Sequence, residues 1–105
     1  MTTTFEVLAE GSRRRILDVL AEGERPVGDL VRLLALGQPA VSKHLKVLRE
    51  AGLVASRTDA QRRLYRITPE PLREVDEWLT PYRRRWAGHL NALERHLAVM
   101  EEHEA

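Results

Sequence analysis

The sequence contains no cysteine, and this absence excludes disulfide bonds, thiolate metal sites and thiol-based redox sensing. It also lacks an apolar run long enough to cross a membrane, and its N-terminus lacks the charged-then-apolar pattern of a signal peptide. We therefore expect a cytoplasmic protein that has no membrane partner. No Gly-rich phosphate loop, HExxH motif or nucleophile motif is found, so we expect no catalytic residues and no enzymatic activity.

The net charge is only +1, but the charges are unevenly distributed along the 105 residues. Residues 38–66 contain seven basic and two acidic side chains, a net charge of +5, whereas residues 1–37 carry −1 and residues 67–105 carry −3. A basic middle segment favours contact with nucleic acid, and the alternative is a solvated charged face. The length fits one small domain, which we place at residues 1–105.

Spaced apolar residues predict three helices in the first third of the chain. We expect Gly11 to end the first helix and Ser12 to cap the second. Pro26 disfavours helix at Arg25 and predicts an extended link there. The predicted order is a short helix around residues 5–9, a helix over 12–21, the link at 25–27 and a short helix over 29–34.

The stretch QPAVSKHLKVLREAGLV, which follows a tight turn at residues 35–37, predicts a helix over residues 39–51. Gln38 is a plausible cap, and Pro39 suits the first helical position because its missing N–H would be unpaired there anyway. Gly52 suits a left-handed C-terminal stop. The i, i+4, i+7 spacing predicts a buried face made of Val41, Leu45 and Leu48.

Two short strands and a long helical segment complete the pattern. Strands are expected at 54–58 and 63–67, with a hairpin turn at 59–62. Alternation places Leu64 on the opposite face from Tyr65 and Ile67, so the hairpin is not simply one-sided. A helical segment then begins after residues 68–69, and we expect Pro81 to interrupt or restart it.

Two helices joined by a short turn, the second basic and followed by a hairpin, are typical of a winged helix-turn-helix. The predicted fold is mainly α, with a two-stranded β-hairpin wing and a long C-terminal dimerisation helix over residues 80–103. The function expected of this fold is sequence-specific binding to a double-stranded DNA operator. A plain helical hairpin in an all-α bundle is the alternative.

The candidate DNA-binding residues lie on the predicted recognition helix and the hairpin. The first turns of such a helix reach base edges in the major groove, and a residue farther along suits a phosphate. Arginine suits phosphates and narrow minor grooves. His44 lies beside the buried face, where it either packs or contacts a phosphate. The base-reading candidates are Gln38, Ala40, Ser42 and Lys43, and the backbone or minor-groove candidates are Lys46, Arg57, Arg62 and Arg63.

The last segment carries one continuous apolar stripe over about six helical turns. A chain this short has little core left to cover it, so we expect the stripe to pack on a second copy. The alternatives are packing within the monomer and a protein-interaction module that binds a different chain. The predicted homodimer interface consists of Phe5, Leu8, Tyr82, Trp86, Leu90, Leu93, Leu97 and Met100.

Three histidines on the same segment, His89, His96 and His103, are spaced seven residues apart. Residues at this spacing are about 10.5 Å apart along a helix, too far for two of them to bind one metal ion. We therefore predict no metal site. A metal-responsive repressor stays open as an alternative if a partner helix completed the site with Glu94, Glu101 or Glu102.

Three blocks of the sequence resemble the ArsR-type (arsenic-repressor-like) winged-helix transcriptional repressors: LAEGSRRRILDVLAEGERPVGDL, QPAVSKHLKVLREAGLV and QRRLYRITPEPL. The resemblance implies a homodimer formed through the first and last helices, and repression by operator occlusion. Many members release DNA on binding metal, through a Cys-x-Cys run in the supporting helix or through carboxylate and histidine pairs on the terminal helix. The matching region here, PVGDLVRLL, has no cysteine, and the histidine spacing differs. The chain thus resembles the cysteine-free branch, with no cofactor expected and no small-molecule or protein effector identified.

Overall fold

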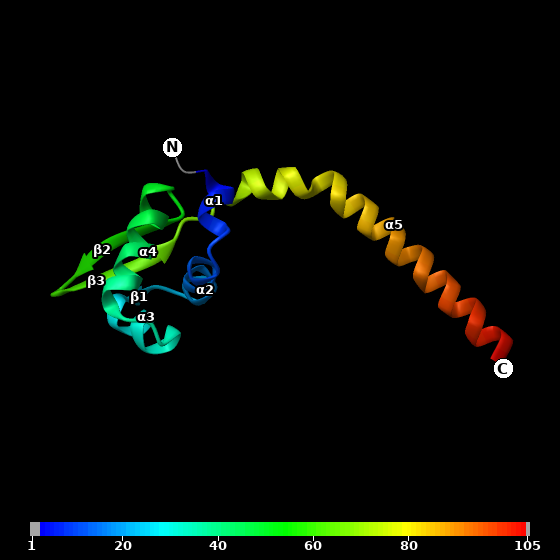
Figure 1. Cartoon of the computed structure of the whole chain (residues 1–105), viewed down its shortest axis with the longest axis horizontal. Helices are drawn as coiled ribbons and strands as arrows, with labels where there is room; N and C mark the ends of the chain where they lie inside the picture. The colour runs from blue at the N-terminus through cyan, green and yellow to red at the C-terminus, as the bar shows by residue number, and fades with distance from the viewer. Residues whose placement is uncertain (1–2, 105) are drawn as a thin grey trace. The chain divides into compact units, whose positions relative to one another are not determined.

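The computed structural model describes the backbone of residues 3–104 and the side chains of residues 3–100. Two compact units divide the chain after Val75. The first unit contains four helices and a small sheet, and the second consists of most of one long helix (Figure 1). The elements are α1 (Thr4–Leu8), α2 (Gly11–Leu20), β1 (Arg25–Pro26), α3 (Val27–Leu34), α4 (Gln38–Glu50), β2 (Val54–Asp59), β3 (Arg62–Ile67) and α5 (Leu72–Glu104).

Both short N-terminal helices begin with a side-chain cap. The Thr3 hydroxyl accepts a hydrogen bond from the Glu6 N–H at 3.1 Å, and Glu10 Oε1 accepts one from the Ser12 N–H at 3.2 Å. The prediction that Gly11 ends the first helix and Ser12 caps the second was therefore wrong. Glu10 is the N-cap, because its backbone is extended and its side chain reaches the free N–H groups of the next turn.

The predicted extended link at residues 25–27 contains a third strand. Arg25 pairs with Tyr65 and Pro26 with Leu64, so β1 joins β3 in an antiparallel sheet of order β1-β3-β2. Pro26 is tolerated there because β1 is an edge strand. The support helix α3 consequently begins at Val27, two residues earlier than predicted.

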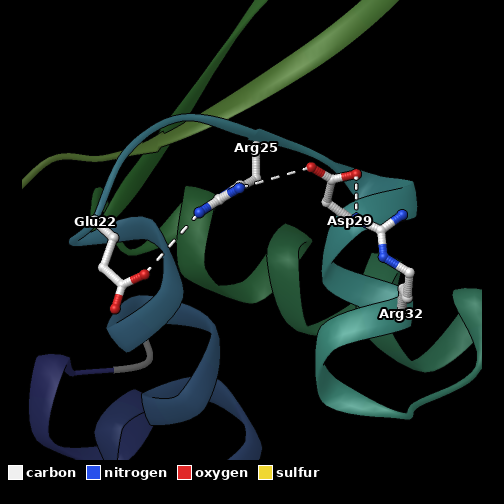
Figure 2. A network of polar contacts seen from close by, with 4 residues as sticks. All are labelled: Glu22, Arg25, Asp29 and Arg32. Atoms are coloured by element: carbon white, nitrogen blue, oxygen red, sulfur yellow. Dashed lines mark hydrogen bonds and ion pairs between the residues drawn. The ribbon is translucent and has the colours of Figure 1, made fainter.

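An ion-pair network fixes the start of α3 (Figure 2). The Arg25 guanidinium lies 4.0 Å from a Glu22 carboxylate oxygen after α2 and 3.9 Å from one of Asp29 in the first turn of α3. Asp29 also accepts a hydrogen bond from Arg32 at 3.2 Å. A carboxylate in the first turn interacts favourably with the helix dipole. The network therefore links the end of α2 to the start of α3.

The turn between α3 and α4 requires an unusual backbone. Ala35 is the C-cap of α3 and has left-handed dihedral angles, φ 55° and ψ 37°. Leu36 is half-buried against the core, as expected for this turn. Gly37, rather than Gln38, is the N-cap of α4, and the helix runs from Gln38 to Glu50, one residue earlier at each end than predicted.

The end of α4 confirms the predicted glycine stop. Gly52 has φ +77°, its N–H donates to the Arg49 carbonyl, and the Leu53 N–H donates to the Leu48 carbonyl. These two bonds form a Schellman motif. Thr68, after β3, returns to the same point, since its N–H donates to the Leu53 carbonyl at 2.8 Å and its hydroxyl to the Gly52 carbonyl at 2.5 Å.

The core forms where α4 packs against α2, α3 and the sheet. The predicted face of α4, Val41, Leu45 and Leu48, is at most 2% exposed and is confirmed as its buried face. Residues from every other element of the first unit except β1 complete the core. The buried apolar side chains beyond α4 are Val7, Ile16, Leu17, Leu20, Leu30, Leu34, Leu53, Val54 and Leu64.

The hairpin forms where it was predicted, with each strand one residue longer at the tip, and it uses both faces. β2 and β3 pair from Val54 with Ile67 out to Asp59 with Arg62, which leaves residues 60–61 as the turn. Leu64 is buried while Tyr65 and Ile67 are half-buried, so neither face of β3 is free of contacts. The fold is the predicted winged helix, mainly helical, and its hairpin is extended to three strands by β1.

Helix α5 continues through Pro81, so the expected interruption was wrong. Proline removes one helical N–H and its ring displaces the carbonyls of the preceding turn. The carbonyl that loses its N–H donor is that of Glu77, four residues before the proline. One residue earlier, the Asp76 carbonyl accepts hydrogen bonds from the Thr80 hydroxyl and the Arg83 guanidinium. Arg83 also pairs with the Asp76 carboxylate.

Replacing Ala35 by glycine is expected to raise the free energy of unfolding by about 0.5–1 kcal/mol. A left-handed conformation costs an L-residue about 1–2 kcal/mol, and glycine removes this cost. Glycine also loses more conformational entropy on folding than alanine, and this offsets about half of the stabilisation. Urea denaturation checks this prediction. Ala21 is the matched control, since it is the C-cap of α2 but right-handed, with φ −64°. Ala21→Gly should lower the midpoint, and a shift of both variants in the same direction would contradict the argument.

Candidate nucleic-acid interface

The outward face of α4 is free to bind a partner. Gln38, Ala40, Ser42, Lys43 and Lys46 are all exposed, and among the residues that the structure describes none of their side chains has a hydrogen bond or ion pair. The first turn of α4 has no side-chain cap, so its N–H groups point outward unpaired. Exposed N–H groups at a helix start, with two lysines beyond them, make an anion-binding surface.

Two wing arginines extend this basic surface. Arg62 and Arg63 are exposed at the start of β3, opposite Asp59 and Thr58 on β2. Successive strand residues point to opposite faces, so the two side chains leave β3 on opposite sides. The structure therefore brings both arginines to the hairpin tip, where we predicted them.

Arg57 differs from the other wing arginines because it already has a partner. Its Nε and Nη2 donate to the two carboxylate oxygens of Glu24 at 2.9 and 3.0 Å, a bidentate ion pair. The hydrogen bond from Arg57 lowers the pKa of Glu24, and the same bond raises the pKa of Arg57. Arg57 pairs with Leu64 in the ladder, away from the tip. Its charge is thus neutralised by the segment that precedes β1.

A run of three arginines on α2, for which no role was predicted, links neighbouring helices. Arg14 Nη1 donates to the Leu8 carbonyl of α1 at 2.6 Å, and Arg15 Nη2 donates to the Leu34 carbonyl of α3 at 3.1 Å. Arg13 Nη1 donates to the Val7 carbonyl of α1 at 3.5 Å. The signal available in the sequence was the position of this run, between two short helices whose last carbonyls need donors.

His44 is half-buried at the edge of α4 that faces α2. Its Nδ1 accepts a hydrogen bond from Nε of Arg13 at 3.4 Å. His44 is therefore packed in part between α4 and α2, and the alternative of a phosphate contact stays a prediction.

The predicted dimer stripe on α5 is exposed in the single chain. Trp86 and Leu90 are 55% and 56% exposed, and Trp78, which sequence reading missed, is 54% exposed. Trp78 contacts Tyr82 with ring centroids 5.0 Å apart and continues the i+4 spacing toward the helix start. The remaining predicted residues of the stripe are also exposed: Tyr82, Leu93, Leu97 and Met100.

The two α1 residues predicted to join the dimer interface differ in burial. Phe5 is 38% exposed, whereas Leu8 is half-buried. Leu8 lines an apolar hollow of about 320 Å³ within the first unit, together with Leu17 of α2, Ile67 of β3 and Leu72.

Over the residues whose side chains are described, no group of three or more His, Asp or Glu side chains could hold a metal ion. His89 and His96 are exposed. The side chains of His103, Glu101 and Glu102, which belong to the alternative metal site, lie outside the described residues. No described helix is long and apolar enough to span a bilayer.

A helix-turn-helix with an exposed second helix and a basic hairpin defines the class of winged-helix regulators. Residues 10–56 match the family model of bacterial regulatory proteins of the ArsR family. The chain is 39% identical over 89 residues to the arsenic resistance transcriptional regulator ArsR1 of Pseudomonas putida, which covers 73% of this chain and 70% of that protein. The chain belongs to the ArsR family.

Other relatives agree with this assignment. Over 68 residues the chain is 47% identical to the HTH-type transcriptional regulator Rv2034 of Mycobacterium tuberculosis, covering 65% of this chain and 64%, just under two thirds, of that regulator. Among solved structures, a possible transcriptional regulator for arsenical resistance superposes with a TM-score of 0.66 at 39% identity, over 73% of this chain and 80% of that one. The transcriptional repressor BigR from Xylella fastidiosa gives a TM-score of 0.60 at 33% identity, over 74% and 81%.

The two kinds of wing arginine should respond differently to substitution. Arg63→Gln is expected to reduce the slope of log K against log salt for a DNA duplex by about 1, the loss of one phosphate contact. Arg57→Gln should leave the slope unchanged, because Glu24 already neutralises this charge. Fluorescence anisotropy at several salt concentrations measures both slopes. Equal reductions in the two variants would show that Arg57 leaves Glu24 and contacts DNA.

Proposed function

We propose that the chain is a homodimeric, sequence-specific DNA-binding transcriptional repressor that acts by occluding its operator. One observation carries this proposal: α4 buries one face completely and leaves the opposite face exposed, polar and without partners among the described residues. An ordinary surface helix shares this division of its faces, so the proposal also depends on the place of α4, after a support helix and a tight turn and before a basic hairpin. Relatives support the repressor role, since they include the transcriptional repressor SdpR of Bacillus subtilis, at 27% identity over 79 residues.

In the proposed complex, α4 enters the major groove, which is about 12 Å wide and admits one helix. Gln38, Ser42 and Lys43 reach base edges from the first turns, and the Ala40 methyl suits a thymine methyl. Lys46, one turn beyond Ser42, contacts a phosphate. The tip arginines Arg62 and Arg63 contact the backbone or minor groove beside the helix. Arg57 supports the wing through Glu24.

Selection of bound sequences from a random DNA pool tests the proposal directly. A dimeric winged-helix protein should enrich a pseudo-palindrome whose half-sites lie about one helical turn apart. The parent chain serves as bait at fixed salt, and the recovered duplex becomes the probe for the variants. If no sequence is enriched, the proposed function is wrong.

Replacing Lys43 by alanine is expected to cost about 1–3 kcal/mol of binding free energy on the selected duplex, because the side chain reads a base. Lys46→Ala is the matched control on the same helix. It should weaken binding equally on the selected duplex and on an unrelated one, since a phosphate carries no sequence information. If Lys43→Ala binds the selected duplex as tightly as the parent, the base-reading assignment is wrong.

We propose that α5 supplies the dimer interface. From residue 76 to residue 100, every side chain of α5 is exposed in the single chain except that of Leu79, which is partly exposed. Most helical stability in proteins comes from packing an apolar face, and a contiguous apolar patch exposed on one chain is typical of an interaction site. Trp86, Leu93 and Met100 repeat at the seven-residue interval at which two copies of one helix can pack together. A second copy of this chain is therefore the occupant that the spacing favours.

Leu93→Glu is expected to convert the dimer into a monomer, because it would bury a carboxylate in the apolar contact. Leu33→Glu provides a matched control, since Leu33 on α3 is 50% exposed and Leu93 is 49% exposed. Sedimentation equilibrium should give twice the chain mass for the parent and the control, and the chain mass for Leu93→Glu. A monomeric parent would favour the interaction-module alternative.

A further inference from the structure

His44 is held between two helices by a single directed contact. It lies on α4 next to the buried Leu45, at the edge that faces α2, and its Nδ1 accepts from Arg13 Nε at 3.4 Å. The Arg13 guanidinium is fixed at a second point by its bond to the Val7 carbonyl at 3.5 Å. Both side chains are partly buried, so the contact is sheltered from competition by water.

This contact determines which imidazole nitrogen carries the proton. A guanidinium has five donors and no acceptor, so His44 Nδ1 must offer its lone pair. The proton of the neutral ring then sits on Nε2. Nε2 has no hydrogen-bond partner in the described part of the chain and is not among the buried unpaired atoms, so it reaches solvent as a donor.

The position of this donor on α4 suits a contact with the sugar-phosphate backbone that borders the major groove. Base edges face the exposed side of α4, whereas the flanks of a helix in the major groove face the sugar-phosphate backbones. His44 occupies the flank beside α2. Each of the neighbouring α2 arginines, Arg13, Arg14 and Arg15, donates to one main-chain carbonyl. The Nε2–H of His44 is the donor that α4 itself presents at this edge.

We propose that Arg13 is a positioning residue that fixes His44 in its Nε2–H tautomer, so that the uncharged imidazole donates a hydrogen bond to a DNA phosphate. The proposal rests on the proposed DNA-binding function. Because the imidazole is uncharged, the contact adds affinity without releasing a counterion. It thus differs from the lysine contacts of the same helix, which release counterions when they neutralise phosphates.

Two substitutions of His44 separate its two nitrogens. In His44→Asn the amide oxygen replaces Nδ1 and keeps the Arg13 bond, but the outward donor is lost. In His44→Gln the amide nitrogen replaces Nε2 and keeps the outward donor. His44→Asn should bind about tenfold more weakly, the effect of losing a charge-assisted hydrogen bond, with an unchanged salt slope. His44→Gln should stay within about threefold of the parent.

The probes are the duplex recovered by selection and an unrelated duplex of equal length, both titrated with the full chain. The loss in His44→Asn should be equal on the two, as for any phosphate contact. Equal affinity of His44→Asn and the parent would overturn the proposal, and so would a tenfold loss in His44→Gln. If the unsubstituted chain binds neither duplex, the proposed DNA-binding function itself is wrong.

A second measurement needs no DNA and uses the parent fold. Nitrogen-15 NMR of the histidine-labelled free chain should show His44 as a single Nε2–H tautomer. Arg13→Met, which keeps an apolar stem but removes the donors, should give a mixture of tautomers. Arg14→Met is the matched control, because it loses only the bond to the Leu8 carbonyl and should leave the tautomer unchanged. An Nδ1–H tautomer in the parent would overturn the proposal.

Discussion

The ends of short helices impose the constraint on which the first unit depends. A helix leaves its last four carbonyls without partners, and in helices as short as α1 and α3 these carbonyls are a large share of the backbone. Consecutive arginines of α2 donate to the ends of both: Arg13 and Arg14 to α1, and Arg15 to α3. Helix α2 is thereby bonded to the helices on either side of it in the chain, and α4 packs its apolar face into the arrangement that results.

Local periodicity made much of this fold predictable. The spacing of Val41, Leu45 and Leu48 identified the buried face of α4, and Gly52 identified its end, because both signals depend on neighbouring residues alone. The predictions that were wrong involve residues bonded to other parts of the chain, which the spacing of apolar residues does not reveal. Strand β1 exists only because β3 pairs with it some forty residues later in the chain. Helix α5 continues through Pro81, and around it the Asp76 carbonyl is bonded by the side chain of Arg83, seven residues later.

For the candidate site, the sequence predicted where positive charges gather, but not which of them are neutralised. Lys43 and Lys46 were placed on the exposed face by helical spacing, and their side chains do lie there. Arg57 belongs to the same basic segment, yet Glu24 binds it from a distant part of the chain. The α2 arginines each donate to a main-chain carbonyl, which holds the side chain but does not neutralise its charge. A count of basic residues therefore overstates the charge available to a nucleic acid, and the pairing of each guanidinium decides its role.

The closure of the wing at its base has a consequence for how this family can diversify. Thr68 bonds the carbonyls of both Gly52 and Leu53, so the hairpin leaves and rejoins the body of the protein at one point. A loop pinned in this way can change length at its tip for little free energy, since each doubling of a flexible loop costs only about 0.6 kcal/mol. Insertions between β2 and β3 would leave the end of α4 in place. The wing is therefore a segment whose reach can evolve independently of the recognition helix.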